Sequence, residues 1–265
     1  MSPFERYEAI QAVNWSLLKQ MRVSPLHFKH AEDNPTEDTT RFGIGRAIHT
    51  AILQPERLAL DYAVFDGARR AGRKWKAIKA LHAGKTILKR DEWAAVESVF
   101  KRVQADAVAQ EWLAIGKSLI ERPIVWTDSA TGLMCKGRSD AVHSMVVDVK
   151  STSSIDERTF LGLATRLGYF GQLAFYRRGY RTLTKMNLPC AIIAVELDAP
   201  HDIGVFVPDE DSLRVADEEI SRLLAKVAEC RKSGVWPGRY QKAQPLVMPE
   251  WARGGANDFN LWEAA

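Results

Sequence analysis

The stretch "MCKGRSDAVHSMVVDVKSTSS", residues 134–154, decides the fold. It has the pattern of two β-strands around a tight turn, yet it carries Asp140, Asp148 and Lys150 where a sheet is normally apolar. Side chains alternate between the two faces of a strand, so Asp148 and Lys150 point the same way while the valines beside them point into the core. Asp140 lies near the end of the preceding strand, which brings it alongside Asp148 and Lys150. The pattern predicts two carboxylates and an ammonium group on one face at a sheet edge.

This charged cluster has two interpretations. Two carboxylates held close together repel each other unless a cation lies between them, and such oxygen ligands suit Mg²⁺ or Mn²⁺. The lysine can then position or deprotonate a water, or neutralise developing phosphate charge. Alternatively, Asp148 and Lys150 form only an exposed ion pair, which this spacing commonly gives. Val146 and Val147 indicate a buried strand, and a buried charged pair is costly without a role, so we favour the metal-dependent site.

The neighbouring segments predict an α/β fold. A third strand is expected just before this stretch, in "SLIERPIVWTD", so that three strands run in succession. Residues 156–185 have a helical pattern, and two further strands are expected in "CAIIAVELDAP" and "IGVFVP". A long helix capped by Asp91, with one apolar face from Trp93 to Ala107, is expected in the first half of the chain. A strongly patterned helix ends at Gly234, and a tail rich in proline and glycine follows.

We expect one domain, residues 1–265, with a central mixed β-sheet flanked by helices. Residues 1–115 are predicted to be mainly helical additions. Residues 116–208 are predicted to hold the sheet and the helix that follows its first strands. Residues 209–265 are predicted to form a C-terminal helix and an extended tail.

Composition excludes several classes of site. The chain has 265 residues and a formal net charge of +4, which permits an anionic partner without demanding one. Cys135, Cys190 and Cys230 form no CxxC pair, so neither a zinc ribbon nor a disulfide framework is supported. No GxxxxGK[ST] sequence is present, which argues against ATP hydrolysis. We find no signal peptide and no apolar run of membrane-spanning length, so a cytoplasmic location without membrane contact is expected.

The spacing of the charged residues resembles a known signature. Asp140, then seven residues, then Asp148-Val149-Lys150 is similar to the D…(D/E)xK motif of the PD-(D/E)xK nuclease superfamily. Glu121 precedes this motif on the strand before it. The resemblance implies a restriction-endonuclease-like core. It also implies that Asp140 and Asp148 are metal ligands with the Val149 carbonyl as a third candidate, that Lys150 is the catalytic lysine, and that Glu121 binds a second metal or orients the water.

Two further motifs narrow the resemblance to the RecB-like nucleases. Gln172 and Tyr176, in "GYFGQLAFYRRGY", form a QxxxY pair, and Gly45 and His49, in "GIGRAIHTAILQP", form a GxxxH motif. The resemblance implies that His49 completes the second metal site and that the QxxxY pair contacts DNA or the catalytic lysine. Without this resemblance, His49 would be interpreted as an ordinary helix histidine. Gln172 and Tyr176 would likewise be interpreted as an ordinary, partly exposed pair. The ordered set of motifs is most similar to RecE-like nucleases.

A basic segment offers a candidate DNA contact. Its cations can neutralise several phosphates, and its tryptophan could stack on a base. The alternative is a solvated helix face. The segment comprises Arg69, Arg70, Arg73, Lys74, Trp75, Lys76 and Lys79.

The RecE-like resemblance implies a Mg²⁺-dependent (or Mn²⁺-dependent) exonuclease, with two ions, that degrades linear double-stranded DNA from the 5′ end and leaves 3′ single-stranded tails. It implies a phage or prophage origin, a single-strand annealing protein as partner, and a ring-shaped homo-oligomer, with a tetramer favoured and a trimer as the alternative. Trp251, Phe259 and Trp262 in the tail are candidates for the subunit contact.

Three other functions are alternatives to a RecE-like exonuclease. The first is a RecB-like nuclease of other polarity, or an endonuclease. The second is a Cas4-type nuclease, which is disfavoured because an iron–sulfur cluster needs four cysteines and the chain has three. The third is a catalytically silent DNA-binding module, against which the complete set of acidic residues and lysine argues.

Overall fold

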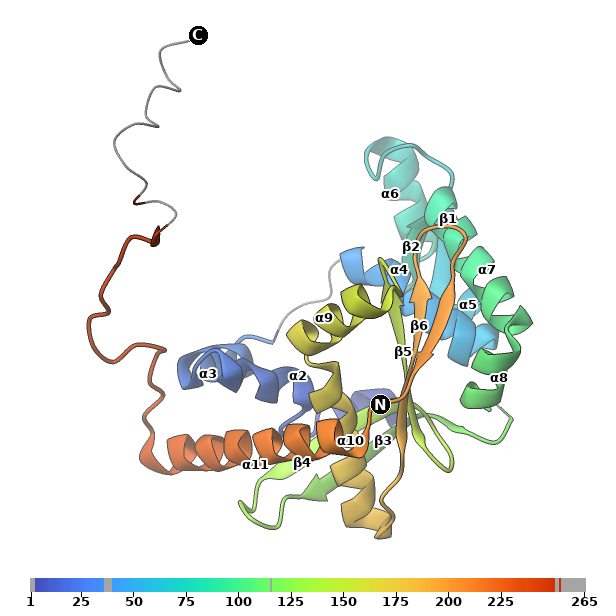
Figure 1. Cartoon of the computed structure of the whole chain (residues 1–265). Coiled ribbons are helices and arrows are strands. Elements are labelled where there is room, and N and C mark those ends of the chain that lie inside the picture. The colour runs from blue at the N-terminus through green and yellow to red at the C-terminus, as the bar shows by residue number, and fades with distance from the viewer. Residues whose placement is uncertain (1–2, 36–39, 115, 251–252, 254–265) are drawn as a thin grey trace.

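A five-stranded mixed β-sheet forms the centre of the protein, with helices on both faces (Figure 1). The structure, a computed structural model, describes residues 3–35, 40–114, 116–250 and 253. Along the sheet the strands follow the order of the chain, and they are β3 (Leu119–Thr127), β4 (Met134–Val142), β5 (Val146–Thr152), β6 (Cys190–Glu196) and β7 (Ile203–Phe206). This architecture confirms the predicted α/β class with a mixed sheet flanked by helices.

The pairing of the strands follows from the connections between them. β3, β4 and β5 form an antiparallel meander, as the sequence predicted, because short turns join them. β5 and β6 are parallel, so the chain must cross over between them, and it does so through α9 (Glu157–Leu167) and α10 (Tyr169–Thr184). Gly168, with φ of 80°, separates the two helices, and only glycine adopts this left-handed conformation without cost.

One face of the sheet is covered by α10, α11 (Glu210–Ser233) and the short α2 (Trp15–Leu18). Phe175 of α10, Ile220 of α11 and Leu18 of α2 are each fully buried there. α3 (Pro25–Asp33), which begins after the Ser24 cap with Pro25 in its first turn, packs at the edge of the same layer. α11 ends at Gly234, as predicted.

The other face is covered by α4 (Thr40–Leu53), α7 (Arg90–Ala105) and α8 (Ala107–Leu113). Val147 and Val149 of β5 pack into this layer with Ile48 of α4 and Val99 of α7. The alternation predicted for β5 is therefore confirmed, since Val147 and Val149 face this core and Asp148 lies on the opposite side of the strand.

The long N-terminal helix differs from the prediction at both ends. Its N-cap is Lys89, and Asp91 lies inside the first turn, so the predicted Asp91 cap is wrong. The backbone amide of Lys89 donates to Glu92 Oε2 at 2.7 Å, which satisfies an amide that the helix leaves free. The helix ends at Ala105, and Ala107 begins α8, because Asp106 breaks the run and caps the second helix.

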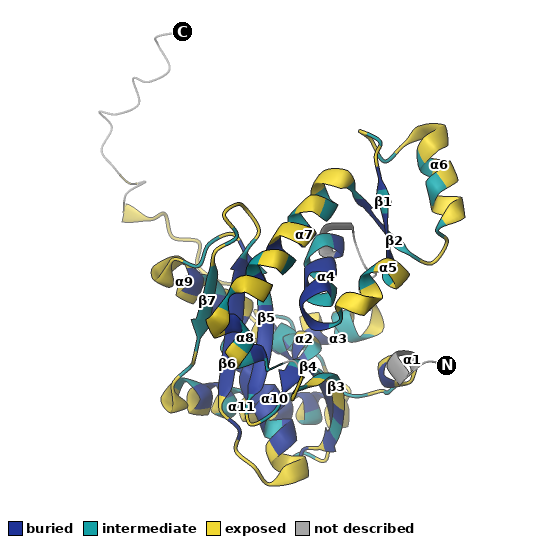
Figure 2. Ribbon diagram, turned by 90° about the vertical axis from the view of Figure 1, so that its right-hand side faces the viewer, coloured by how far each residue is buried: buried dark blue, intermediate teal, exposed yellow. Residues whose placement is uncertain are grey.

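Two short strands in the N-terminal part were not predicted. β1 (Tyr62–Phe65) and β2 (Thr86–Lys89) form a separate parallel pair, and α6 (Gly72–Leu81) connects them. The unit β1–α6–β2, which we call the basic arm, projects from the body of the molecule, with α6 farthest out (Figures 1 and 2). The remaining short helices are α1 (Pro3–Glu8), η1 (Lys19–Arg22), η2 (Pro55–Arg57) and α5 (Leu58–Asp61).

The tail is fixed at its beginning. Trp236 stacks on Phe28 of α3 with ring centroids 5.5 Å apart, and Leu26 N donates to Pro237 O at 3.1 Å. Farther along, Leu246 is fully exposed. The predicted subunit contacts Trp251, Phe259 and Trp262 lie outside the described residues. None of the helices in the described ranges combines the length and apolar character needed to cross a membrane.

Candidate active site

Strand β4, strand β5 and helix α4 bring the charged motif residues together. The Asp140 Oδ2 atom accepts a hydrogen bond from the Val149 amide at 2.6 Å, which fixes this carboxylate to the backbone of the next strand. His49 Nδ1 of α4 lies 3.5 Å from the same Asp140 oxygen. α4 runs directly over β5, because a Cβ atom placed on Gly45 would lie 3.5 Å from Ser151 Oγ.

Asp148 and Lys150 form a buried ion pair on the same face of β5. The Asp148 side chain is only 2% exposed and that of Lys150 15%. Lys150 Nζ also lies 5.0 Å from the centroid of the Tyr169 ring, at the start of α10. A carboxylate and an ammonium group are therefore held out of water next to the Asp140–His49 pair.

The electrostatics of this cluster are strongly coupled. Burial raises the pKa of Asp148 to about 6, and the neighbouring Asp140 charge adds to that rise against the opposing Lys150. Burial also works against ionisation of Asp140, but the charges of His49 and Lys150 outweigh it and lower the pKa of Asp140. Burial opposes the charge on Lys150, yet the two aspartates keep its pKa above the ordinary lysine value. Burial and mutual repulsion therefore oppose ionisation of the two carboxylates, while the charges of Lys150 and His49 favour it.

The donor set can be tested for its fit to a divalent ion. Asp148 is buried and Asp140 is largely buried, the two carboxylates disfavour each other's charge, and a hard cation would relieve that repulsion. His49 adds a nitrogen donor 3.5 Å from Asp140. In donor chemistry these residues fit Mg²⁺ or Mn²⁺. Within the part of the chain that the structure describes, no group of three or more His, Cys, Asp and Glu side chains is arranged closely enough to hold an ion.

Glu121 lies beside this cluster without joining it. β3 pairs Ile120 with Ala141 and Arg122 with Ser139, so Glu121 falls opposite Asp140, at a position that the pairing of the two strands skips while their register continues. Its φ of 45° turns the backbone out of the regular strand path at this point. The Glu121 carboxylate forms an ion pair with Arg138 at 3.8 Å. Its predicted role at a second metal therefore stays a prediction.

The QxxxY pair lies on the face of α10 that is turned towards β4. Gln172 Nε2 donates to Tyr176 Oη at 3.1 Å, and the Tyr176 ring is 9% exposed. A Cβ atom on Gly137 would lie 2.9 Å from the Tyr176 ring, so glycine at this position of β4 makes room for the aromatic side chain. Burial first, and then the charge of Asp148, raises the pKa of Tyr176. Tyr176 is thus buried within electrostatic range of the charged cluster, and Gln172 is partly buried beside it.

Two residues near the site were missed by sequence reasoning. Tyr169 precedes Tyr176 by seven positions, or two helical turns, and this spacing on the QxxxY face was a usable signal. Lys19 of η1 is half-buried, and its side-chain ammonium group forms no hydrogen bond or ion pair with any described residue. Burial first, and then the charges of Lys150 and Arg22, lower the pKa of Lys19. Nothing in the local sequence around Lys19 indicated this position.

The predicted DNA-binding residues divide into two groups in the basic arm. Arg70 forms an ion pair with Glu92 and donates to the Ile87 carbonyl at 3.5 Å, so it stabilises the arm itself. Trp75 packs edge-on against Phe65 with ring centroids 5.2 Å apart, so much of its ring is already covered. The other five side chains are exposed, and these are Arg69, Arg73, Lys74, Lys76 and Lys79.

Three comparisons with known proteins bear on this site. A family model described as "PDDEXK-like domain of unknown function (DUF3799)" matches residues 14–247. A crystal structure described as "Putative exonuclease" from Eubacterium rectale is similar, with a TM-score of 0.67 and 14% identity over 95% of this chain and 97% of that one. A second crystal structure, of SSO0001, has a TM-score of 0.29 at 14% identity, over 71% of this chain and 87% of that one. This score is too low to indicate a shared fold. No curated protein matches the chain.

At 14% identity the structural likeness shows a shared fold, and it agrees with the family match. Together they confirm the predicted PD-(D/E)xK nuclease and its fold class. The matched region begins at Asn14, which caps α2, and it includes the charged cluster, α10 and the basic arm. The chain belongs to the DUF3799 family of PDDEXK-like domains.

Proposed function

We propose that this nuclease is a metal-dependent exodeoxyribonuclease that degrades linear double-stranded DNA from its 5′ ends. The observation that carries the proposal is the largely buried group of Asp140, Asp148 and Lys150, with His49 beside it. The group lies on β4 and on β5, the middle strand of the sheet, and not at the sheet edge that the sequence predicted. Burying two carboxylates and an ammonium group costs folding free energy, and a role in a reaction accounts for that cost. Phosphodiester hydrolysis uses these groups, because negative charge develops on the phosphate in the transition state.

Each residue of the cluster has a distinct task in this proposal. Asp140 and Asp148 would hold the divalent ion, with the Val149 carbonyl and His49 as further donors. When bound, such ions supply electrophilic stabilisation of the phosphate charge. Lys150 would position the attacking water or neutralise charge at the phosphate. Its ammonium group is already oriented by the Asp148 carboxylate, so little reorganisation is needed when charge develops.

The basic arm supports binding of a nucleic-acid backbone. α6 contains no acidic residue in its sequence "GRKWKAIKAL". The arm is rooted on the helix that carries His49, because a Cβ atom on Gly43 of α4 would lie 3.5 Å from Thr86 Cγ2 of β2. Gly43 and His49 are six residues apart, or about 9 Å along a helix, so the arm begins close to the cluster. DNA held along the arm would therefore lead towards the charged residues.

The finer biology follows from resemblance to RecE-like nucleases. We propose that the enzyme leaves 3′ single-stranded tails for a single-strand annealing protein in phage-type recombination. A closed ring of subunits would retain the DNA between cuts, with the tail that includes Trp251, Phe259 and Trp262 as the contact.

Polarity and the need for an end are tested with three substrates. Linear duplexes labelled on either the 5′ or the 3′ terminus and a covalently closed circle are incubated with the enzyme and Mg²⁺. We expect early release of label from the 5′ terminus, late release from the 3′ terminus, and an intact circle. Release from the 3′ terminus first would reverse the proposed polarity, and cutting of the circle would favour an endonuclease. Binding without any cleavage would indicate a silent DNA-binding module.

A further inference from the structure

The Tyr169 ring is a second neighbour of the Lys150 ammonium group, in addition to Asp148. Lys150 Nζ lies 5.0 Å from the ring centroid, within the range of a cation–π interaction. The same ammonium group forms an ion pair with Asp148. A lysine side chain has four rotatable bonds, so one ion pair alone leaves it free to pivot. A carboxylate and an aromatic face together restrict that movement.

The fold holds the Tyr169 ring in this place. Gly168 takes a left-handed φ of 80°, and α10 begins at the next residue, so the backbone at Tyr169 is fixed by the turn between two helices. The ring also lies against Phe160 of α9, with centroids 6.2 Å apart. Tyr169 and Tyr176 share one face of α10. The ring therefore contacts both Phe160 and the Lys150 ammonium group.

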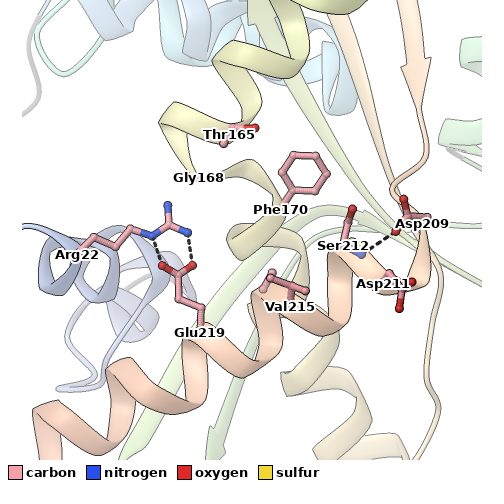
Figure 3. A pocket seen from close by; sticks show the side chains of 10 residues that line it. Arg22, Thr165, Gly168, Phe170, Asp209, Asp211, Ser212, Val215 and Glu219 are labelled. Atoms are coloured by element: carbon pink, nitrogen blue, oxygen red, sulfur yellow. Dashed lines mark hydrogen bonds and ion pairs between the residues drawn. The ribbon is translucent and has the colours of Figure 1, made fainter.

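Its neighbour in the sequence faces elsewhere. Phe170 lines a pocket of about 400 Å³ between the start of α10 and α11, with the Arg22–Glu219 ion pair at its rim (Figure 3). The first turn of α10 thus carries two aromatic side chains, and of the two only Tyr169 has a cation–π contact with Lys150. This pair provides a matched comparison within one turn of helix.

We propose that Tyr169 is a positioning residue, whose aromatic face holds the Lys150 ammonium group against Asp148 and in the orientation that the cleavage step needs. The inference rests on the proposed role of Lys150 in hydrolysis. Because the contact is made by the face of the ring, the tyrosine hydroxyl is dispensable. Because Tyr169 acts through Lys150, its loss slows cleavage without weakening DNA binding.

The test compares side chains at position 169 in the full chain, with single-turnover and steady-state cleavage of a labelled linear duplex in Mg²⁺. Wild type and Lys150→Ala are measured first, because an inactive wild type or a fully active Lys150→Ala would overturn the proposed function itself. With that function intact, Tyr169→Leu should lower kcat by about tenfold and leave KM unchanged, the size of effect that a desolvated cation–π contact can give. Tyr169→Phe should stay within about twofold of wild type because it keeps the ring. Phe170→Leu, the matched control, should keep the wild-type kcat.

A series of fluorinated phenylalanines at position 169 separates ring electronics from packing. Successive fluorine atoms weaken the negative face of the ring with little change of shape, so kcat should fall step by step from phenylalanine to pentafluorophenylalanine. This series decides the matter even if Tyr169→Leu unfolds. A flat series, an equal loss of kcat in Tyr169→Phe and Tyr169→Leu, or a loss confined to KM would each overturn the proposal.

Discussion

The basic arm gives a prediction whose size can be worked out from the structure. Replacing Arg73 and Lys74 with alanine removes two exposed cations from α6 and leaves the packed side of the arm, Trp75 on Phe65, untouched. If both side chains contact phosphates, the variant should bind duplex DNA more weakly. Its affinity should also depend less on salt, because fewer counterions are released from the DNA on binding.

The expected change in salt dependence follows from the number of cations. Each phosphate contact contributes about 0.9 to the slope of log affinity against log salt, so losing two contacts should lower the slope by about 1.8. The loss of affinity of the variant relative to wild type should therefore be about tenfold larger at 50 mM salt than at 200 mM salt. Arg70 is left out of the count because its guanidinium group is already paired with Glu92.

Fluorescence anisotropy of a labelled duplex measures both the affinity for DNA and its dependence on salt. The Lys150→Ala background keeps the DNA intact while Mg²⁺ is present. The matched control is Lys232→Ala with Lys242→Ala, two exposed lysines outside the arm whose loss changes the net charge by the same amount. An unchanged slope in the arm variant, or an equal change in the control, would refute a specific DNA contact and leave α6 as a solvated helix face.

Three further changes test packing, binding and assembly. Gly171→Ala should destabilise the fold by about 1–3 kcal/mol in urea unfolding, because its Cβ atom would lie 2.1 Å from the buried ring of Trp15. The control is Gly162→Ala in α9, where the added Cβ atom faces open space and should not destabilise the fold. Equal effects of the two substitutions would contradict this packing. Lys19→Met should raise KM for DNA and keep kcat, because a half-buried ammonium group that has no partner among the described residues suits a phosphate. An unchanged KM would refute the contact. Removing residues 250–265 should shift the protein to smaller species in light scattering and reduce processivity, whereas an unaltered assembly would exclude the tail as the ring contact.

The sequence predicted the strands that carry the charged cluster better than it predicted the N-terminal region around them. The meander of β3, β4 and β5 was predictable because hydrophobic alternation and short turns are local features of the chain. The side to which Asp148 and Lys150 point follows from the same alternation. The approach of Asp140 to Val149 required only that two adjacent strands pair antiparallel, which a tight turn dictates.

Other features depended on contacts between distant segments. β1 and β2 have four residues each and are stable only as a parallel pair across α6, so neither shows a periodic signal of its own. The ion pair of Arg70 with Glu92 and the packing of Trp75 become visible only once that unit is folded. Lys19 comes near Lys150 because α2 packs on α10, a contact between helices about 150 residues apart in the chain.

The central claim is that the buried carboxylate–lysine cluster performs metal-dependent cleavage of DNA. The most direct measurement is the initial rate of cleavage of an end-labelled linear duplex by wild type, Asp148→Ala and Lys150→Ala, with circular dichroism showing that all three are folded. Wild type should cleave in Mg²⁺, stop in chelator and recover with excess Mg²⁺, while both variants lose about 10²-fold or more, the loss typical when a group that stabilises transition-state charge is removed. Near wild-type cleavage by either variant, or full activity in chelator, would contradict the account.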